Sequence, residues 1–406
     1  MIVITIVVTA LVLIYIYLNA LSYYIHKTRM HDNFDHRIHV NGIRGKSSVT
    51  RLVSATLREG GVKTIGKSTG SAARIIVSHD EDLVIERVEA DIAEQKRTLK
   101  KYMGKGVRAV VVECMAINPV YQKYLENRVM FSTIGVITNV REDHMDLLGK
   151  TLPEIARSLS NTIPTGGGDL ITAESDPEIL AIFEQECEKR GATLHTVKNI
   201  RVSDKDMAGF SHFEHKPNVA IALKVAQLVG VSRKKALAGM HKALPDPGAF
   251  ALKTLKEGRK KIHWANLFAI NDRESFIITA EALCKKVGPK AKKTIILNNR
   301  KDRPDRVAQF VDIAVNSLAI DTIVTFGDYE KQVTKEIQRH GKTKKVKVLN
   351  LGNSTEYAKC DGGQLFEKIV ESSRGTETIL FGAVNIHTPQ AVALLEKLEG
   401  GSGHGH

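Results

Sequence analysis

The chain has 406 residues, of which 43% are hydrophobic and 26% charged, an ordinary balance for a globular protein. This length predicts two or three domains and allows large buried cores. Its four cysteines are scattered without CxxC spacing, which excludes a zinc site and a disulfide framework and suits a reducing cytoplasm. The last seven residues, Gly400 to His406, resemble a linker or tag remnant and are excluded from the fold prediction.

The formal net charge of +14 predicts an acidic partner: a nucleotide, an anionic lipid, another polyanion or nucleic acid. Basic runs cluster in the C-terminal half of the chain, where each is also explained by a solvated face. The sequence has no basic stripe interleaved with aromatic residues, so we expect no nucleic-acid partner.

The N-terminal stretch has a different composition. No charged residue occurs from Ile2 to Ile25, and a helix needs roughly 20 apolar residues to cross the hydrocarbon core. Lys27 and Arg29 follow at once, whereas no Lys or Arg precedes the stretch, so the positive-inside rule places the rest of the chain in the cytoplasm. We expect residues 1–26 to be a single-pass transmembrane anchor in the cell membrane, with a buried core helix as the alternative.

After this anchor, apolar β-rich runs alternate with amphipathic stretches, which predicts an α/β domain with a mainly parallel, doubly wound sheet over residues 27–246. The predicted strands are Arg37–Val40, Arg108–Cys114, Thr133–Asn139, Asp169–Thr172 and Thr193–Val197. The predicted helices are Ser47–Glu59, Ile92–Met103, Pro153–Ile163, Pro217–Leu228 and Ser232–Leu244.

The segment Leu244–Gly248, with the sequence LPDPG, is the clearest break in the chain. Beyond it a second alternating series predicts a smaller, Rossmann-like α/β domain over residues 247–399. Its predicted strands are Ile262–Ala269, Thr294–Asn298, Thr322–Phe326, Val346–Leu349 and Thr378–Phe381. Its predicted helices are Glu274–Lys286, Arg303–Asn316, Glu330–Arg339, Gln364–Ser372 and Pro389–Leu398.

A glycine-containing loop connects the first soluble strand to a helix and has the pattern of a phosphate site. Glycines let backbone N–H groups approach an anion, and the helix N-terminus adds partial positive charge. Val40 stands where the usual GxxxxGK pattern has its first glycine, and an ordinary capped βα turn is the alternative. We expect Lys46 to neutralise β/γ-phosphate oxygens and Ser47 to ligate Mg²⁺; the predicted nucleotide-binding loop comprises Gly42, Arg44, Gly45, Lys46, Ser47 and Ser48.

Two further strand ends carry groups suited to a nucleotide–metal site. The apolar strand at residues 109–113 ends in Glu113, a carboxylate with no packing reason to be there. The next segment, TNVREDHMD, presents Asn139, Asp143 and His144 after another strand. Such a cluster can hold a divalent cation and orient a phosphate, although His144 alone would be interpreted as an ordinary surface or core histidine.

These motifs resemble the Mur ligases and folylpolyglutamate synthase. The resemblance extends to the segment EHKPNVA around Asn218. Finer details resemble the ligase subunits of poly-γ-glutamate synthases, and with the N-terminal anchor the resemblance covers residues 1–399. These details are the sequences NGIRGKSSVTRL, GKSTGSAAR, ECMAINPVYQ, EDHMD, PDPGA, FAIND, NNRKDRPDR and GAVNIH.

The resemblance implies roles that spacing alone does not assign. It implies that Ser47, Glu113 and His144 ligate Mg²⁺, that Asn139 contacts the γ-phosphate region and that Asn218 lies near the nucleoside. Further residues, in the loop Gly66–Arg74 of the first domain and in the second domain, are implied to face the nucleotide or the reacting groups. Asn271 and Asp272 are expected to face the nucleotide, Arg74 to bind the substrate carboxylate, and Arg300 and Arg303 to reach an acyl phosphate or the incoming glutamate.

Two departures from the family pattern stand out. Many relatives hold a second metal with a carbamylated lysine about fifteen residues past the Asp-His pair, but this stretch is Arg157-Ser-Leu-Ser160 here. The second Mg²⁺ is therefore held differently, or a water or substrate carboxylate substitutes. In addition, Ile270 replaces a histidine of the loop that faces the nucleotide.

By resemblance we expect an ATP- and Mg²⁺-dependent amide ligase that joins glutamate through its γ-carboxylate, via an acyl phosphate, to make poly-γ-glutamate. The basic charge suits this polyanionic product, and closure of the second domain is expected to exclude water. Integral-membrane and extracellular subunits of a synthase complex are the expected partners. The alternatives are a different Mur- or folylpolyglutamate-type glutamyl ligase, which the anchor disfavours, and a non-ligase ATPase of a membrane complex.

Overall fold

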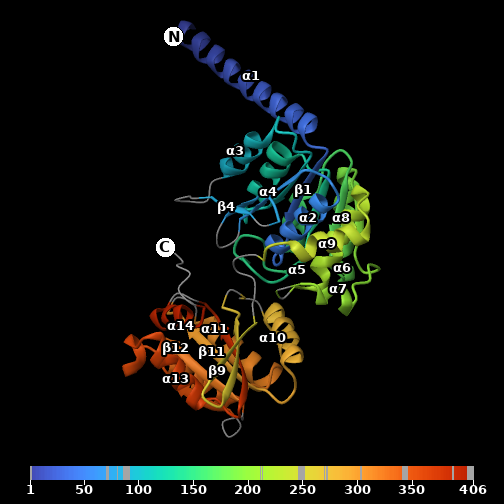
Figure 1. Cartoon of the computed structure of the whole chain (residues 1–406). Helices are drawn as coiled ribbons and strands as arrows, with labels where there is room; N and C mark the ends of the chain where they lie inside the picture. The colour runs from blue at the N-terminus through green and yellow to red at the C-terminus, as the bar shows by residue number, and fades with distance from the viewer. Residues whose placement is uncertain are drawn as a thin grey trace. The chain divides into compact units, whose positions relative to one another are not determined.

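The computed structural model describes residues 2–69, 73–79, 81–85, 92–210, 212, 214–245, 252–268, 270, 273–301, 304–340, 346–385 and 388–399. The chain forms two compact units, Met1–Ala249 and Phe250–His406. Each unit is built on one sheet with helices against it (Figure 1). The prediction of an α/β fold with mainly parallel sheets is confirmed.

The first unit contains an eight-stranded sheet with the order β4-β3-β2-β5-β1-β6-β7-β8. The six strands from β2 to β8 in this order are parallel, and β3 and β4 are added antiparallel at one edge. The strands β5, β1 and β6 are neighbours in the middle of the sheet, and their carboxyl ends therefore lie side by side. The strands are β1 (His36–Asn41), β2 (Thr64–Ser68), β3 (Arg74–Ile76), β4 (Asp82–Val84), β5 (Ala109–Glu113), β6 (Ile134–Ile137), β7 (Asp169–Thr172) and β8 (Thr193–Thr196).

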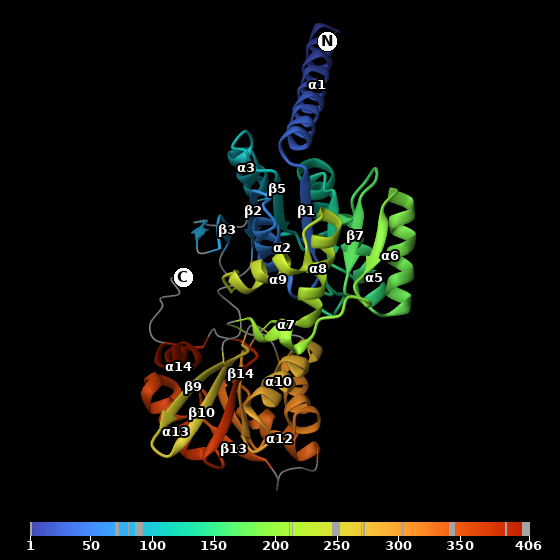
Figure 2. The same cartoon turned by 45° about the vertical axis from the view of Figure 1, so that its right-hand side comes forward.

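Helices cover both faces of this sheet (Figure 2). Alternate residues of β5 divide between the two faces: Ala109 and Val111 pack with α2, α8 and α9, whereas Val110 and Val112 pack with α3 and α4. This alternation is the period of two that a strand buried on both faces requires. The helices are α2 (Lys46–Glu59), α3 (Ile92–Tyr102), α4 (Pro119–Leu125), α5 (Leu152–Leu159), α6 (Pro177–Arg190), α7 (Asp204–Ala208), α8 (Lys216–Val229) and α9 (Arg233–Lys242), with a π-helical turn η1 (Glu126–Met130) after α4 and a 3-10 turn η2 (Ser160–Thr162) after α5.

The N-terminal helix α1 (Ile2–Asn33) is long and apolar enough to span a membrane. It projects from the α/β body of the first unit (Figures 1 and 2), with its apolar side chains exposed from Ile2 to Leu18. Its last turns pack on this body: His26 Nε2 lies 3.1 Å from the Val129 carbonyl oxygen, and Met30 is fully buried. The helix thus continues past residue 26, the expected end of the anchor.

The second unit contains a six-stranded sheet with the order β13-β12-β11-β14-β10-β9, parallel except for β9. Trp264 is buried on β10 against Phe268, and on the other face Phe276 meets Phe310 edge to face at 5.2 Å. The strands are β9 (Leu252–Glu257), β10 (Lys260–Asn266), β11 (Lys292–Asn299), β12 (Thr322–Gly327), β13 (Lys347–Asn350) and β14 (Glu377–Ala383). The helices are α10 (Arg273–Val287), α11 (Asp305–Asp312), α12 (Glu330–Arg339), α13 (Gly362–Ser372) and α14 (Pro389–Glu399), with short turns η3 (Ile313–Ser317) and η4 (Glu356–Lys359).

Candidate active site

The loop between β1 and α2 has the backbone that its two glycines permit. Gly42 has a φ of 122° and Gly45 a φ of 83°, both in the region that favours glycine. A Cβ on Gly42 would lie 2.1 Å from Thr138 Oγ1, so no larger residue fits there. The loop ends on the first turn of α2, where backbone N–H groups and the helix dipole favour an anion.

The carboxyl end of β6 holds this loop in shape. The Asn139 side chain makes two hydrogen bonds to the Arg44 backbone. Its Oδ1 accepts from the Arg44 N–H at 3.0 Å, and its Nδ2 donates to the Arg44 carbonyl at 3.1 Å. Thr138 Oγ1 donates to the same carbonyl at 2.6 Å, and the Ile43 N–H donates to the Asn139 carbonyl at 3.2 Å. The loop is therefore preorganised by protein groups. Asn139 acts in this structure on the loop itself, and its predicted γ-phosphate contact stays a prediction.

Lys46, the first residue of α2, turns back over the loop. Its Nζ donates to the carbonyl oxygens of Gly42 at 2.8 Å and Ile43 at 3.2 Å. Burial lowers the pKa of the Lys46 ammonium, while the Glu113 carboxylate opposes that shift. A cation hydrogen-bonded to neutral carbonyls in this position is suited to exchange them for anionic oxygens.

Ser47 and Glu113 are brought together from α2 and β5. The Ser47 hydroxyl donates to Glu113 Oε2 at 2.9 Å, and the Thr69 N–H donates to the same oxygen at 2.8 Å. Glu113 is only 3% exposed, and its backbone carbonyl accepts from Gln95 Nε2 at 2.8 Å. A buried carboxylate beside a hydroxyl supplies the hard oxygen donors that Mg²⁺ prefers.

His144 is not brought into this pair. Its side chain is 47% exposed, and its ring Nε2 lies 3.9 Å from Asp143 Oδ1. No hydrogen bond or ion pair joins it to Ser47 or Glu113, all three being described residues. Asp143 instead pairs with Arg44 at 3.1 Å, linking the segment after β6 to the phosphate loop. Over the described residues, no three His, Cys, Asp or Glu side chains form a group that could hold a metal ion.

Asn218 lies against the phosphate loop from the first turn of α8. A Cβ on Gly45 would lie 2.9 Å from Asn218 Oδ1, so this glycine is needed for the close approach of the helix. Asn218 Nδ2 donates to Glu214 Oε1 at 2.8 Å, which fixes the amide. The segment after β6 and the first turn of α8 thus both contact the loop.

The two parts of the chain are each similar to a known protein family. Residues 40–241 match the family model of the Mur ligase middle domain, and residues 252–401 match that of the poly-gamma-glutamate synthase CapB C-terminal domain. PGA synthase CapB of Bacillus subtilis (strain 168) is 35% identical to the chain over 366 residues, which are 89% of this chain and 90% of that protein. The chain belongs to the CapB family. The resemblance to poly-γ-glutamate synthase ligases is confirmed, and the chain is an enzyme of the ligase class.

A second CapB relative agrees with the family assignment, and a solved structure shares the fold. Capsule biosynthesis protein CapB of Bacillus anthracis is 34% identical over 306 residues, 75% of this chain and 65% of that protein. The bifunctional folylpolyglutamate synthase/dihydrofolate synthase of Yersinia pestis, complexed with AMPPNP and a Mn ion, superposes with a TM-score of 0.58 over 90% of this chain and 88% of that one, at 14% identity. At that identity the likeness establishes the shared fold alone.

The remaining predicted residues of this CapB-family chain lie in three places. Arg74 begins β3 and pairs with Ser68 at the carboxyl end of β2, so it lies at the same edge of the sheet as Glu113. Its Nε is buried and has no hydrogen-bond partner among the described residues, which exclude the neighbouring residues 70–72. Ser48 is half-buried in the first turn of α2. Arg300 directly follows β11 in the second unit, and Asn271, Asp272 and Arg303 lie outside the described residues.

Sequence reasoning missed three residues that shape this site: Thr138, Thr69 and Gln95. Thr138 was adjacent to a predicted residue, and the alternation of strand residues offered no reason to single it out. Thr69 contributes only its backbone N–H to Glu113, which no side-chain pattern reveals. Gln95 is fully buried on α3. Its place on the buried face of the helix, among apolar residues, was the signal that could have identified it.

Proposed function

We propose that this chain joins glutamate through its γ-carboxylate, via an acyl phosphate, to make poly-γ-glutamate, using ATP and Mg²⁺ at the loop between β1 and α2. The proposal rests on membership of the CapB family and on one structural observation. That observation is the phosphate loop whose first helical hydroxyl, Ser47 Oγ, lies 2.9 Å from the buried Glu113 carboxylate. The nucleotide and the Mn ion in the Yersinia pestis relative support the same choice of ligands.

The residues present fit a triphosphate. Only a residue without a side chain fits at Gly42, because Thr138 occupies the space a Cβ would need. The N–H groups of Ile43 and Arg44 are bonded to Asn139, so we expect the phosphates to meet the N–H groups at the start of α2. Lys46 holds two neutral carbonyls, and we expect its ammonium to leave them for β/γ-phosphate oxygens, since charge-assisted hydrogen bonds are stronger.

The residues present also fit one divalent cation. Ser47 and Glu113 would supply a hydroxyl and a carboxylate oxygen, with nucleotide oxygens and water completing the shell. When bound, Mg²⁺ neutralises the charge that spreads over the transferring phosphoryl group. We propose His144 as a further ligand on the resemblance alone. Its exposed side chain, next to Asp143, would have to turn toward Glu113.

The proposed reaction converts a poor electrophile into a good one. A carboxylate oxygen of glutamate attacks the γ-phosphorus, the bond to the β-phosphate oxygen breaks, and ADP leaves. The amine of the next residue then attacks the acyl carbon, loses a proton, and phosphate leaves as the amide forms. The obstacle is repulsion between the carboxylate and the triphosphate, which the Lys46 charge lowers.

We propose Arg74 as the group that receives the substrate carboxylate. It lies at the sheet edge that carries Glu113, and its guanidinium is a donor suited to a carboxylate. In the second unit, Arg300 remains the proposed contact for the acyl phosphate or the incoming glutamate. Asn271 and Asp272 remain proposed nucleotide contacts.

We propose further that α1 anchors the enzyme in the cell membrane by a single span, with both units in the cytoplasm. The length and apolar surface of α1 support this, as do the basic residues that follow it. Integral-membrane and extracellular subunits of a synthase complex are the proposed partners.

The test is ADP release by the full-length chain in membranes, with ATP, Mg²⁺ and glutamate, followed by analysis of the product for γ-linked amides. We expect ADP release to depend on glutamate, Lys46→Ala to abolish it, and the exposed control Lys242→Ala to leave it unchanged. Glutamate-independent ADP release without amide product would identify a non-ligase ATPase, and a strict requirement for folate would identify a folate-type glutamyl ligase. Full activity of Lys46→Ala would remove the nucleotide assignment from this loop.

A further inference from the structure

A cavity of about 250 Å³ lies between α1 and α3, away from the phosphate loop. Its wall changes character along α1. Leu18, Leu21 and Ile25, in the uncharged stretch of α1, line one part. Arg29 and Lys100 line the other part. The cavity therefore has an apolar end and a basic end.

The basic end has no acidic side chain paired with it in the part of the chain that the structure describes. Among the described residues, neither the Arg29 guanidinium nor the Lys100 ammonium has an acidic partner, and both residues are exposed. Lys96, one turn before Lys100 on α3, adds a third positive charge, and burial together with the Lys100 charge lowers the pKa of Lys96. Three cations gathered at one place attract an anion.

The apolar end continues the surface expected inside the bilayer. Leu18, Leu21 and Ile25 are 55%, 39% and 47% exposed, and they lie in the last part of the uncharged stretch of α1. From Leu18 to Arg29 the helix rises by about 16 Å at 1.5 Å per residue. This is enough to lead from the hydrocarbon region to the level of the lipid phosphates.

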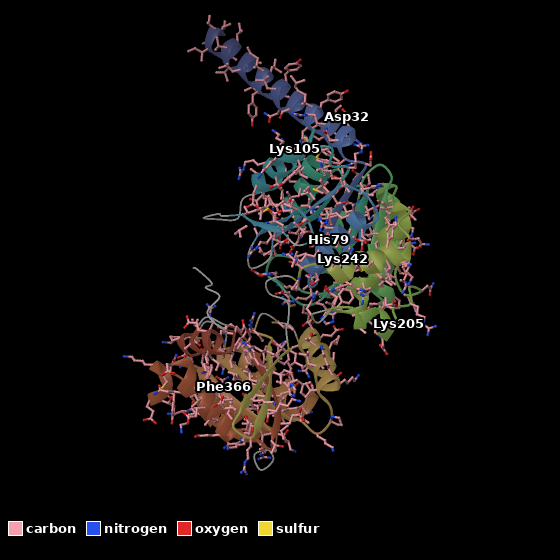
Figure 3. All side chains as sticks on the ribbon, in the orientation of Figure 1. Asp32, His79, Lys105, Lys205, Lys242 and Phe366 are labelled. Atoms are coloured by element: carbon pink, nitrogen blue, oxygen red, sulfur yellow. The ribbon has the colours of Figure 1, made fainter. Side chains whose placement is uncertain are left out.

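The two walls of the cavity are fixed to each other. The Gly104 N–H, just after α3, donates to Asn33 Oδ1 at the end of α1 at 2.6 Å. Asp32 and Lys105, which flank this bond, lie close to the junction of α1 with the α/β body (Figure 3). On another side of α1, Tyr23 packs against Phe131 with 5.6 Å between ring centroids. The cavity is thus a built feature of the first unit.

We propose that this cavity binds a membrane lipid with an anionic phosphate headgroup, the phosphate lying between Arg29 and Lys100 and an acyl chain along Leu18, Leu21 and Ile25. The inference rests on the proposed membrane anchoring by α1. A purely apolar occupant, such as a helix of another membrane protein, would bury these two cations without compensation, which is strongly unfavourable. A zwitterionic lipid brings its own cation, so an anionic lipid is the better match.

The experiment uses native mass spectrometry of the full-length chain in detergent with equimolar phosphatidylglycerol and phosphatidylcholine. We expect one retained phosphatidylglycerol, and a loss of apparent affinity of about 25-fold in the double variant Arg29→Gln/Lys100→Gln, about fivefold for each removed charge. The matched control, Lys27→Gln/Lys101→Gln, removes two charges from the same two helices outside the cavity and should change the affinity less than threefold. Melting temperatures within 2 °C of the parent verify that each variant is folded.

Other outcomes overturn the proposal. Equal retention of phosphatidylcholine would make the cavity a non-selective groove, and equal losses in both double variants would leave only diffuse charge attraction. Displacement of the lipid by millimolar glycerol phosphate would assign the site to a free phosphate ester. Flotation with neutral phosphatidylcholine vesicles tests the anchor separately: failure to float removes the membrane assignment, whereas flotation without phosphatidylglycerol preference removes only the lipid site.

Discussion

Replacement of Gly42 by alanine tests the geometry of the phosphate loop most directly. The new Cβ would lie 2.1 Å from Thr138 Oγ1 and 2.7 Å from the Thr138 backbone nitrogen. Neither atom is free to move, because Oγ1 donates to the Arg44 carbonyl and the N–H donates to the Asn41 carbonyl. The substitution must therefore displace the loop from β6 or distort both.

The magnitude has two parts that a control separates. A φ of 122° is unfavourable for alanine by about 1–3 kcal/mol, and overpacking adds about 1–3 kcal/mol. Gly61 has a φ of 93° with no atom within 4 Å of its Cβ position, so Gly61→Ala carries only the first part. The excess destabilisation of Gly42→Ala over Gly61→Ala therefore measures the contact with Thr138.

The assay is calorimetric unfolding of the full-length chain in detergent, where 1 kcal/mol shifts the melting temperature of a unit of this size by about 2–4 °C. The single tryptophan, Trp264, is buried in the second unit, so its fluorescence transition should stay unchanged in both variants. Nucleotide affinity should fall at least tenfold for Gly42→Ala and stay within twofold for Gly61→Ala. Equal melting temperatures and equal nucleotide affinities in the two variants would refute the proposed packing of the loop.

Two further predictions concern groups buried beside the loop. Glu113→Gln keeps an acceptor for the Ser47 hydroxyl but removes the charge, so the Mg²⁺ concentration for half-maximal activity should rise at least about tenfold; an unchanged metal titration would exclude Glu113 as a ligand. On β1, burial alone would lower the pKa of His39, but Cys114 and Glu126 outweigh it and raise the pKa to about 10 from its ordinary value of 6.5. The resulting stability should be complete below pH 6.5 and decline as the pH rises toward 10, and Glu126→Gln should flatten this pH dependence in thermal melts.

The sequence predicted the strands and helices that carry their own periodicity. The strand that ends at Glu113 and the helix from Glu330 to Arg339 each combine an apolar period with a clear boundary. It missed β2, β3 and β4, because three of the five residues of β2 are polar and β3 and β4 have three residues each. The Lys67 side chain on β2 is buried, and its charge is paired with Glu94 at 2.7 Å. No local sequence pattern reveals this long-range contact.

The candidate site was predictable to the level of strand ends but not of side-chain contacts. Parallel strands place their carboxyl ends at one edge, so Glu113 and Asn139 were expected near the loop. The conformation of the segment after β6 is a tertiary outcome: His144 has a φ of 47° and is held by its N–H to Asp143 Oδ1. Likewise, the end of α1 was set by its packing on Val129 rather than by hydropathy.

The segment Arg157–Ser160, where the resemblance predicts a carbamylated lysine that this chain lacks, bears on how a second cation is held. Ser158 Oγ donates to the Leu148 carbonyl at 2.5 Å, Leu159 is buried, and Ser160 Oγ donates to the Ala156 carbonyl at 2.8 Å. These side chains are neutral, so this segment supplies no anionic ligand for a second Mg²⁺. We expect a second ion to take its anionic ligands from the triphosphate and the substrate carboxylate. Manganese binding followed by electron paramagnetic resonance should show one ion with nucleotide alone and two only when glutamate is added; two ions with nucleotide alone would contradict this reasoning.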